Sequence, residues 1–258
     1  MKTNQLLFIL LLVSCIAVVR LAAQQTNADQ KPIEEVKAKA EAGDAEFQVE
    51  LGRRYNKGEG VMKDQVEAVK WYRKAAEQKF AKAQYTLGIC YDQGAGVAKD
   101  QVEAVKWYRK AAEQKFAPAQ NNLGVCYELG EGLAKDEEEA VKWYRKAAEQ
   151  NYSIAQNNLG ACYSNGEGVT RDWEEAAKWY RKAAEQNFAA AQYNLGNCYV
   201  RGAGVADDLV EAYKWELLAA KQGDEDARKL VTWLEKNAFL KPEQIAQGQK
   251  RAREFKPR

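Results

Sequence analysis

The side chains that most often carry out covalent chemistry are scarce in this chain. Its 258 residues contain no histidine, so neither a Ser-His-Asp triad, a Cys-His pair nor a histidine-ligated metal site can be built. The three serines, Ser14, Ser153 and Ser164, lie in no Ser-x-x-Lys or Gly-x-Ser-x-Gly motif. We therefore expect no catalytic residues and no cofactor.

Cysteine is the remaining nucleophile, and it recurs at a fixed step of 36 residues, at Cys90, Cys126, Cys162 and Cys198. Helices that stack ~8–10 Å apart place equivalent Cα atoms beyond the ~7 Å that a disulfide can bridge. The same spacing keeps the thiolates from converging on one metal ion. We therefore expect four free thiols in the core and no metal site.

Charge balance bears on the class of partner. The chain has 39 basic and 37 acidic residues, and two of the basic ones, Lys2 and Arg20, fall in the first 23 residues. Without them the two counts are equal. A neutral chain lacks the positive footprint of a nucleic-acid-binding protein, so a nucleic-acid partner is not expected.

Residues 1–23 have the composition of a secretory signal peptide, with Lys2 before an apolar run and small residues up to Ala23. We expect cleavage after Ala23 and export to the periplasm or out of the cell. Two alternatives stay open. Residues 12–15 match a lipobox, in which Cys15 would be acylated, and the apolar run can instead stay as an anchor, although it is shorter than the ~20 residues a spanning helix needs. A membrane is expected as a partner only in these two cases.

The elements that would position any site belong to an internal repeat. Tryptophan recurs every 36 residues, at Trp71, Trp107, Trp143, Trp179 and Trp215, and tyrosines and Leu-Gly pairs keep the same step. Each unit reads as two helices joined by a glycine loop. In the second unit the first helix ends at Gly94, and the second begins at Asp100, which forms a capping box with Glu103. One pair of helices cannot bury both of its apolar stripes, so the units must stack.

The chain is accordingly divided into a leader, a helical array and an end cap. The expected parts are a signal peptide (1–23), an N-terminal half-repeat (31–43), five repeats (44–79, 80–115, 116–151, 152–187 and 188–223), and C-terminal capping helices with a basic tail (224–258).

The repeat resembles the Sel-1-like repeat, a relative of the tetratricopeptide repeat with a longer loop. The resemblance rests on Ala119-Gln120, Leu123-Gly124, Tyr127, Gly130-x-Gly132, Asp136, Ala140 and the run from Trp143 to Gln150. It implies an all-α fold, a right-handed α-solenoid of stacked helix-turn-helix units. It also implies a protein-interaction scaffold in which the first helices line the concave face.

Two departures from the family pattern concern aromatic residues. The interior junctions carry Phe80, Phe116, Tyr152 and Phe188 where an Asp cap is usual. These rings either pack between units or form an exposed aromatic ridge. Trp173 takes a place that is polar or aliphatic in the other units, and we expect it to be exposed.

The candidate partner-binding residues lie on the first helices. The position before each Leu-Gly pair holds Asn122, Asn158 and Asn194, whose amides can grip an extended peptide backbone. Neighbouring positions on the same expected face are Asn121, Asn157, Tyr85, Tyr193, Arg53 and Asn197. Alternatively, the Asn residues hold adjacent helices together by hydrogen bonds.

The sequence thus favours a non-catalytic exported scaffold that binds a protein or peptide. The alternative is a cell-envelope enzyme acting on β-lactams or peptidoglycan, because some secreted members of this family have been linked to β-lactams.

Overall fold

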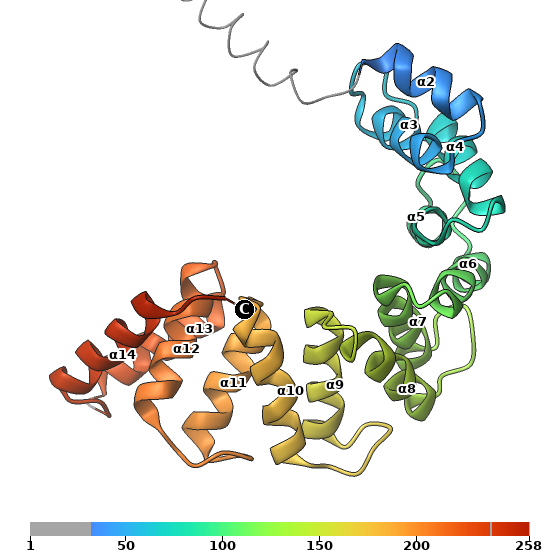
Figure 1. The fold of residues 1–258 in the computed structure, drawn as a ribbon. Coiled ribbons are helices and arrows are strands. Elements are labelled where there is room, and N and C mark those ends of the chain that lie inside the picture. Colours follow the sequence, from blue (N-terminus) through green and yellow to red (C-terminus); the bar gives the residue numbers. More distant parts are fainter. Residues whose placement is uncertain (1–31, 238, 258) are drawn as a thin grey trace, which may run out of the picture. The chain divides into compact units, whose positions relative to one another are not determined.

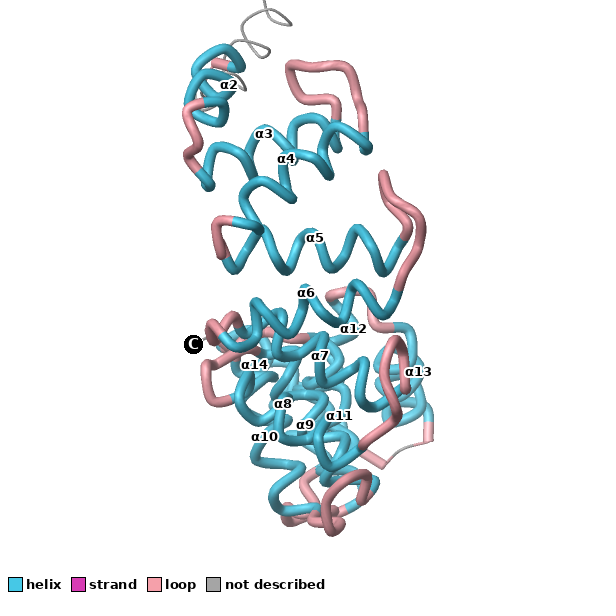
Figure 2. Tube along the Cα trace, turned by 90° about the vertical axis from the view of Figure 1, so that its right-hand side faces the viewer, coloured by secondary structure: helices cyan, strands magenta, loops and turns pink. Residues whose placement is uncertain are grey.

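All regular structure in the described part of the chain is helical (Figures 1 and 2). The computed structural model describes residues 32–237 and 239–257, so the expected signal peptide and Cys15 lie outside the described residues. The chain divides into two compact units, Met1–Gln78 and Lys79–Arg258. The first contains α2 (Ile33–Glu41), α3 (Ala45–Lys57) and α4 (Gln65–Glu77). The expected all-α class is confirmed.

The second unit carries ten helices in successive pairs. They are α5 (Ala81–Gln93), α6 (Gln101–Glu113), α7 (Ala117–Leu129), α8 (Glu137–Ala148), α9 (Ser153–Asn165), α10 (Trp173–Glu185), α11 (Ala189–Arg201), α12 (Leu209–Lys221), α13 (Glu225–Lys236) and α14 (Pro242–Glu254). Each helix from α5 to α12 packs on the next one along the chain. No helix of the two described segments is long and apolar enough to cross a membrane.

The helix ends follow the expected signals in all but one respect. Gly94 ends α5 in the left-handed conformation, with φ 70°, and the Asp100 side chain accepts the Glu103 amide at 2.9 Å. The prediction that the Asp100 amide donates back to the Glu103 carboxylate is wrong. The Asp100 amide donates to the Tyr91 carbonyl at 2.9 Å, because the loop folds back onto the end of α5. The Glu103 carboxylate instead pairs with Lys106 at 2.9 Å.

The Leu-Gly pairs mark the closest approach of two helices. A Cβ on Gly88 of α5 would lie 2.6 Å from the ring of Tyr108 in α6. Gly124 and Gly160 meet Tyr144 and Tyr180 in the same way, at 2.7 Å. Only glycine leaves room for the tyrosine ring, which explains why this residue keeps the repeat step.

The tryptophans fill the core between neighbouring pairs, as expected. All five repeat tryptophans are 8% exposed or less. Trp143 of α8, for example, packs with Ala111 of α6 and Leu123 of α7. The repeat tyrosines that follow the cysteines are only half-buried. The hydroxyl of Tyr127 accepts a hydrogen bond from Arg109 at 2.8 Å, and a charged donor keeps that end of the ring near water.

The aromatic residues at the interior junctions favour packing between neighbouring repeats over an exposed ridge. Phe116 is half-buried and its ring centroid lies 5.4 Å from that of Tyr85. Tyr152 and Phe188 pack against the next two hydrophobic clusters. None of the four junction aromatics makes a side-chain cap, which confirms the expected loss of the Asp cap.

A row of buried glutamines links three consecutive helices at each step. Gln120 of α7 donates from Nε2 to the Ala112 carbonyl of α6 at 3.1 Å. Its Oε1 accepts from Gln150, beyond the end of α8, at 2.6 Å. Gln156 and Gln192 repeat both bonds. The family pattern contains this glutamine, but its role appears only in the structure.

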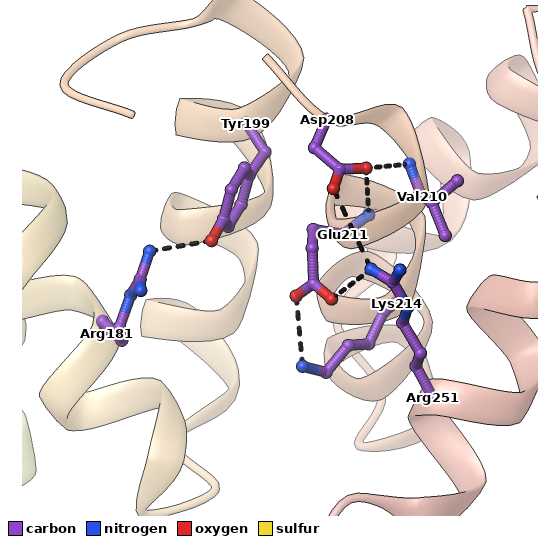
Figure 3. A network of polar contacts seen from close by, with 7 residues as sticks. All are labelled: Arg181, Tyr199, Asp208, Val210, Glu211, Lys214 and Arg251. Carbon is purple, nitrogen blue, oxygen red and sulfur yellow. Dashed lines mark hydrogen bonds and ion pairs between the residues drawn. The ribbon is translucent and has the colours of Figure 1, made fainter. Parts of the chain in front are cut away.

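The C-terminal helices pack on α12. Gly248 of α14 lies against the ring of Tyr213, where an added Cβ would be 2.7 Å from Cδ1, so α14 repeats the glycine-on-tyrosine contact of the earlier pairs. Arg251 of α14 binds Glu211 of α12 at 2.6 Å (Figure 3). Glu211 also binds Lys214, at 3.1 Å. Arg251 therefore fastens α14 to α12 rather than adding to a free basic tail.

Candidate functional site

The residues expected to bind a partner form a regular row on the first helices of the second unit. We call the exposed side of α5, α7, α9 and α11 that carries Tyr85, Asn122, Asn158 and Asn194 the first-helix face. Asn158 donates to Asn121 at 3.0 Å and Asn194 donates to Asn157 at 2.9 Å. Asn122 lies in the same register beside Tyr85, where its amide opposes the burial that raises the pKa of Tyr85. Hydrogen bonding between adjacent helices, one of the two expected roles, is therefore present.

In two of the expected residues, Asn121 and Arg53, the whole polar group is engaged by internal partners. Asn121 is buried, and both ends of its amide bond to other asparagines, Asn122 and Asn158. Arg53 belongs to α3 in the first unit, whereas the other candidates belong to the second. Its guanidinium pairs with Glu50 at 2.8 Å and with Glu59, and this pairing lowers the pKa of Glu50 to about 2. Neither side chain is available as a free recognition group.

The row ends at a pocket on α11. On α13, Leu230 occupies the position that would continue the row by bonding to Tyr193. Its side chain has no polar group, so the row stops at α11. Tyr193, Asn194 and Asn197 instead line a pocket of about 210 Å³. Its other lining residues come from α9, α10, the end of α11 and the loop that follows it: Ser164, Trp173, Tyr180, Cys198, Arg201 and Ala203.

The pocket collects the residues by which these units differ from the others. Ser164 stands where Asp92 and Glu128 stand in earlier units. Asn197 replaces the apolar Ile89, Val125 and Ala161, and Arg201 replaces Lys57, Gln93, Leu129 and Asn165. Trp173 is 37% exposed, so the expected exposure is confirmed.

Sequence reasoning found part of this pocket. Tyr193, Asn194 and Asn197 are among the predicted partner-binding residues, and Trp173 is predicted only to be exposed. The sequence does not predict Arg201 or Ser164 as site residues. The available signal is variation along the repeat, because neither Ser164 nor Arg201 has the same residue at the equivalent position of another repeat.

The four repeat cysteines do not form a reactive centre. They are free and buried, as expected. Burial raises the pKa of Cys90 and Cys198 to about 11, and that of Cys126 and Cys162 to about 12. A thiol with so high a pKa is almost wholly protonated near neutrality, and the thiolate is the nucleophile. Residues 32–237 and 239–257 contain no group of three or more acidic or cysteine side chains that can hold a metal ion.

Thiol accessibility gives a direct test of this burial. In a chain that begins at Gln24, we expect less than about one tenth of the thiols to react with an aromatic disulfide reagent at pH 8 within minutes. All four are expected to react after unfolding in guanidinium. Rapid reaction of one thiol per native chain would contradict the buried, protonated state.

The geometry defines a helical-repeat protein, an α-solenoid of paired helices. The Sel1 repeat family matches the chain at residues 45–80, 81–116, 117–152, 153–188 and 189–224. The chain therefore belongs to the Sel1 repeat family. Proteins of this family are generally protein-interaction scaffolds.

Two solved structures illustrate the relationship. A Sel1 repeat protein from Oxalobacter formigenes is 39% identical, with a TM-score of 0.72, covering 81% of this chain and 85% of that one. A protective antigen of uropathogenic Escherichia coli strains, which displays an SLR fold, is 33% identical with a TM-score of 0.62. That match covers 87% of this chain and 56% of the antigen. No curated protein was found to match the chain.

Proposed function

We propose that the chain is an exported, non-catalytic scaffold that binds a polypeptide partner on its first-helix face. The observation that carries the proposal is the pocket at the end of the asparagine row. It places the aromatic rings of Trp173 and Tyr193 beside the amides of Asn194 and Asn197. Tryptophan and tyrosine are enriched among the residues that contribute most of the binding energy at protein interfaces.

The polar groups of the pocket suit a peptide backbone. The Asn194 amide nitrogen is used by Asn157 and the Asn197 amide nitrogen by the Tyr193 carbonyl, at 2.9 and 3.1 Å. Neither carboxamide oxygen accepts a hydrogen bond from the described residues, so both can accept from peptide N–H groups. The internal bonds hold these oxygens in fixed orientations, which reduces the entropy lost on binding.

The rival function, a β-lactam- or peptidoglycan-cleaving enzyme, has no supporting group in the pocket. Ser164 has the only aliphatic hydroxyl among the residues that line the pocket, and this hydroxyl donates to the Ala161 carbonyl at 2.9 Å. Its other neighbours are Asn165 and the Tyr180 hydroxyl, neither of which is a base that would activate it. We expect no turnover of a chromogenic β-lactam by the purified chain.

Peptide selection tests the proposed function. A random peptide library displayed on phage is panned against the full chain, and the enriched peptides are measured by fluorescence anisotropy. We expect Tyr193→Ala to weaken their binding about tenfold or more, because it removes a ring whose burial contributes about 1.5–3 kcal/mol.

Trp233→Ala serves as the matched control, because Trp233 is an exposed aromatic residue on α13 outside the pocket. It is expected to leave the affinity unchanged. If no peptide is enriched, or if Tyr193→Ala binds as tightly as the wild-type chain, the proposal is wrong.

The proposed export rests on residues 1–23 and has its own measurement. The intact mass of the native protein distinguishes a chain that begins at Gln24 from one that begins at a lipidated Cys15. An intact mass that includes residues 1–23 would contradict cleavage.

A further inference from the structure

We infer that the pocket lined by Trp173, Tyr193, Asn194, Asn197 and Arg201 selects a polypeptide segment with an acidic side chain next to an apolar one. The inference rests on the proposed function and names the chemistry of the segment. Three observations support it: the charge of the pocket, the free hydrogen-bonding capacity of Arg201, and the two aromatic rings that line the pocket.

Arg201 is the only charged residue among those that line the pocket. At the position of Ser164, two earlier units carry carboxylates, Asp92 and Glu128. In the third unit Glu128 takes a hydrogen bond from the Tyr144 hydroxyl, whereas the equivalent Tyr180 hydroxyl pairs with Ser164 at 3.2 Å. The substitution removes a negative charge from the wall, so the pocket is net positive where its equivalents are not.

The Arg201 guanidinium has no internal partner in the described part of the chain. Within the described residues it makes no hydrogen bond or ion pair, although Arg109, Arg145 and Arg181 each bond to a tyrosine hydroxyl. A guanidinium presents a planar fork of N–H donors that matches a carboxylate. An acidic side chain is therefore the group that this side of the pocket fits best.

The two rings account for the apolar neighbour. Trp173 and Tyr193 come from different helices, α10 and α11, and line the same pocket. Arg201 and the two rings line the same pocket, so a segment whose carboxylate pairs with Arg201 can place the side chain next to it against these rings. Burial of an aliphatic or aromatic side chain there strengthens binding, and the charge pair fixes the register.

A positional-scanning peptide library tests the inference with defined probes. The peptides are N-acetylated and C-amidated, so that a carboxylate arises only from Asp or Glu side chains. We expect the wild-type full chain to select Asp or Glu at one position and an apolar residue beside it. For the selected peptide, Arg201→Gln is expected to weaken binding about tenfold or more, as is replacement of the acidic residue by its amide.

A matched variant controls for the change in net charge. Arg253→Gln removes the same charge from an exposed position on α14 outside the pocket, and it is expected to leave the affinity within about twofold. Circular dichroism of each variant checks that the fold is kept. Loss of the selection in Arg201→Gln but not in Arg253→Gln supports the inference.

Other outcomes overturn the inference and separate it from the proposed function. Selected peptides without an acidic residue, whose binding is lost in Tyr193→Ala, leave the scaffold in place and refute the acidic preference. The same peptides are also synthesised with a free C-terminal carboxylate, and binding of these alone, with no amidated peptide bound, refutes the side-chain source. Equal binding by wild type and Arg201→Gln refutes the role of Arg201 in selecting the acidic residue. If no peptide binds at all, the proposed function is refuted as well.

Discussion

Replacing Gly132 by alanine is expected to destabilise the protein by about 3 kcal/mol, and the larger part of this loss comes from a clash between the added Cβ and a backbone carbonyl. Gly132 has φ +73°, where an L residue costs about 1–2 kcal/mol. An added Cβ would also lie 2.2 Å from the Gln101 carbonyl oxygen at the start of α6. This atom cannot move unless the loop between α7 and α8 separates from α6, so overpacking adds about 1–3 kcal/mol.

The chain supplies two controls with the same backbone conformation. Gly130 lies in the same loop at φ +74°, and the nearest atom to its Cβ would be 3.3 Å away on the Lys135 side chain. Gly60 is the equivalent of Gly132 in the first repeat, at φ +73°, with its nearest neighbour at 3.6 Å. Alanine at either position is expected to cost about 1 kcal/mol. Urea unfolding followed by circular dichroism measures all three, and equal losses would refute the clash.

Replacing Glu216 by glutamine is expected to stabilise the protein by about 3 kcal/mol at pH 7. Glu216 occupies the position of the buried tyrosines Tyr72, Tyr108, Tyr144 and Tyr180. Its side chain is fully buried against Gly196, and neither carboxyl oxygen has a hydrogen-bond partner among the described residues. Burial, and to a smaller extent the charge of Asp224, raises the pKa of Glu216 from 4.5 to about 9.

The pH dependence follows from the direction of this shift. Below about pH 4.5 the carboxyl is protonated in both the folded and the unfolded chain, so Glu216 does not cost stability through ionisation. Between about pH 4.5 and 9 only the unfolded chain ionises, and the free energy of unfolding falls by about 1.4 kcal/mol for each pH unit. Glutamine cannot ionise, so the variant escapes this loss.

Urea unfolding of wild type and Glu216→Gln at pH 5, 7 and 9 measures the effect. The stability difference is expected to be smallest at pH 5 and to widen at each step. Glu243→Gln changes an exposed residue of α14, and it is expected to alter the stability by less than about 0.5 kcal/mol. A difference between wild type and Glu216→Gln that does not change with pH would show that the carboxylate is not held in its neutral form.

Much of the fold was predictable because the signals act within a few residues. Gly94 ends a helix through its own backbone freedom, and Asp100 begins one by accepting an amide three residues on. The Trp143 stripe follows from helical periodicity. The predicted bond between the Asp100 amide and the Glu103 carboxylate is absent because the Asp100 amide donates to the Tyr91 carbonyl, and Glu103 pairs with Lys106 instead. Which partner each group takes depends on how the loop folds back onto α5.

The candidate site was predictable only in part. The row of Asn122, Asn158 and Asn194 was visible, but not whether these amides face a ligand or each other. Their partners lie on the neighbouring helix, so the answer depends on the distance between packed helices. Arg201 and Ser164 differ from their repeat equivalents in the sequence, yet nothing local shows that they line the same pocket.

The sequence by itself determined the length of the repeat, the helices and their ends, and the residues that must be buried between helices. These properties follow from periodicity and capping, which operate along the chain. The tertiary structure alone decided which polar side chains are used internally and which stay free. Asn121 is used inside the stack and Arg201 is not, because hydrogen bonds between helices depend on how those helices pack.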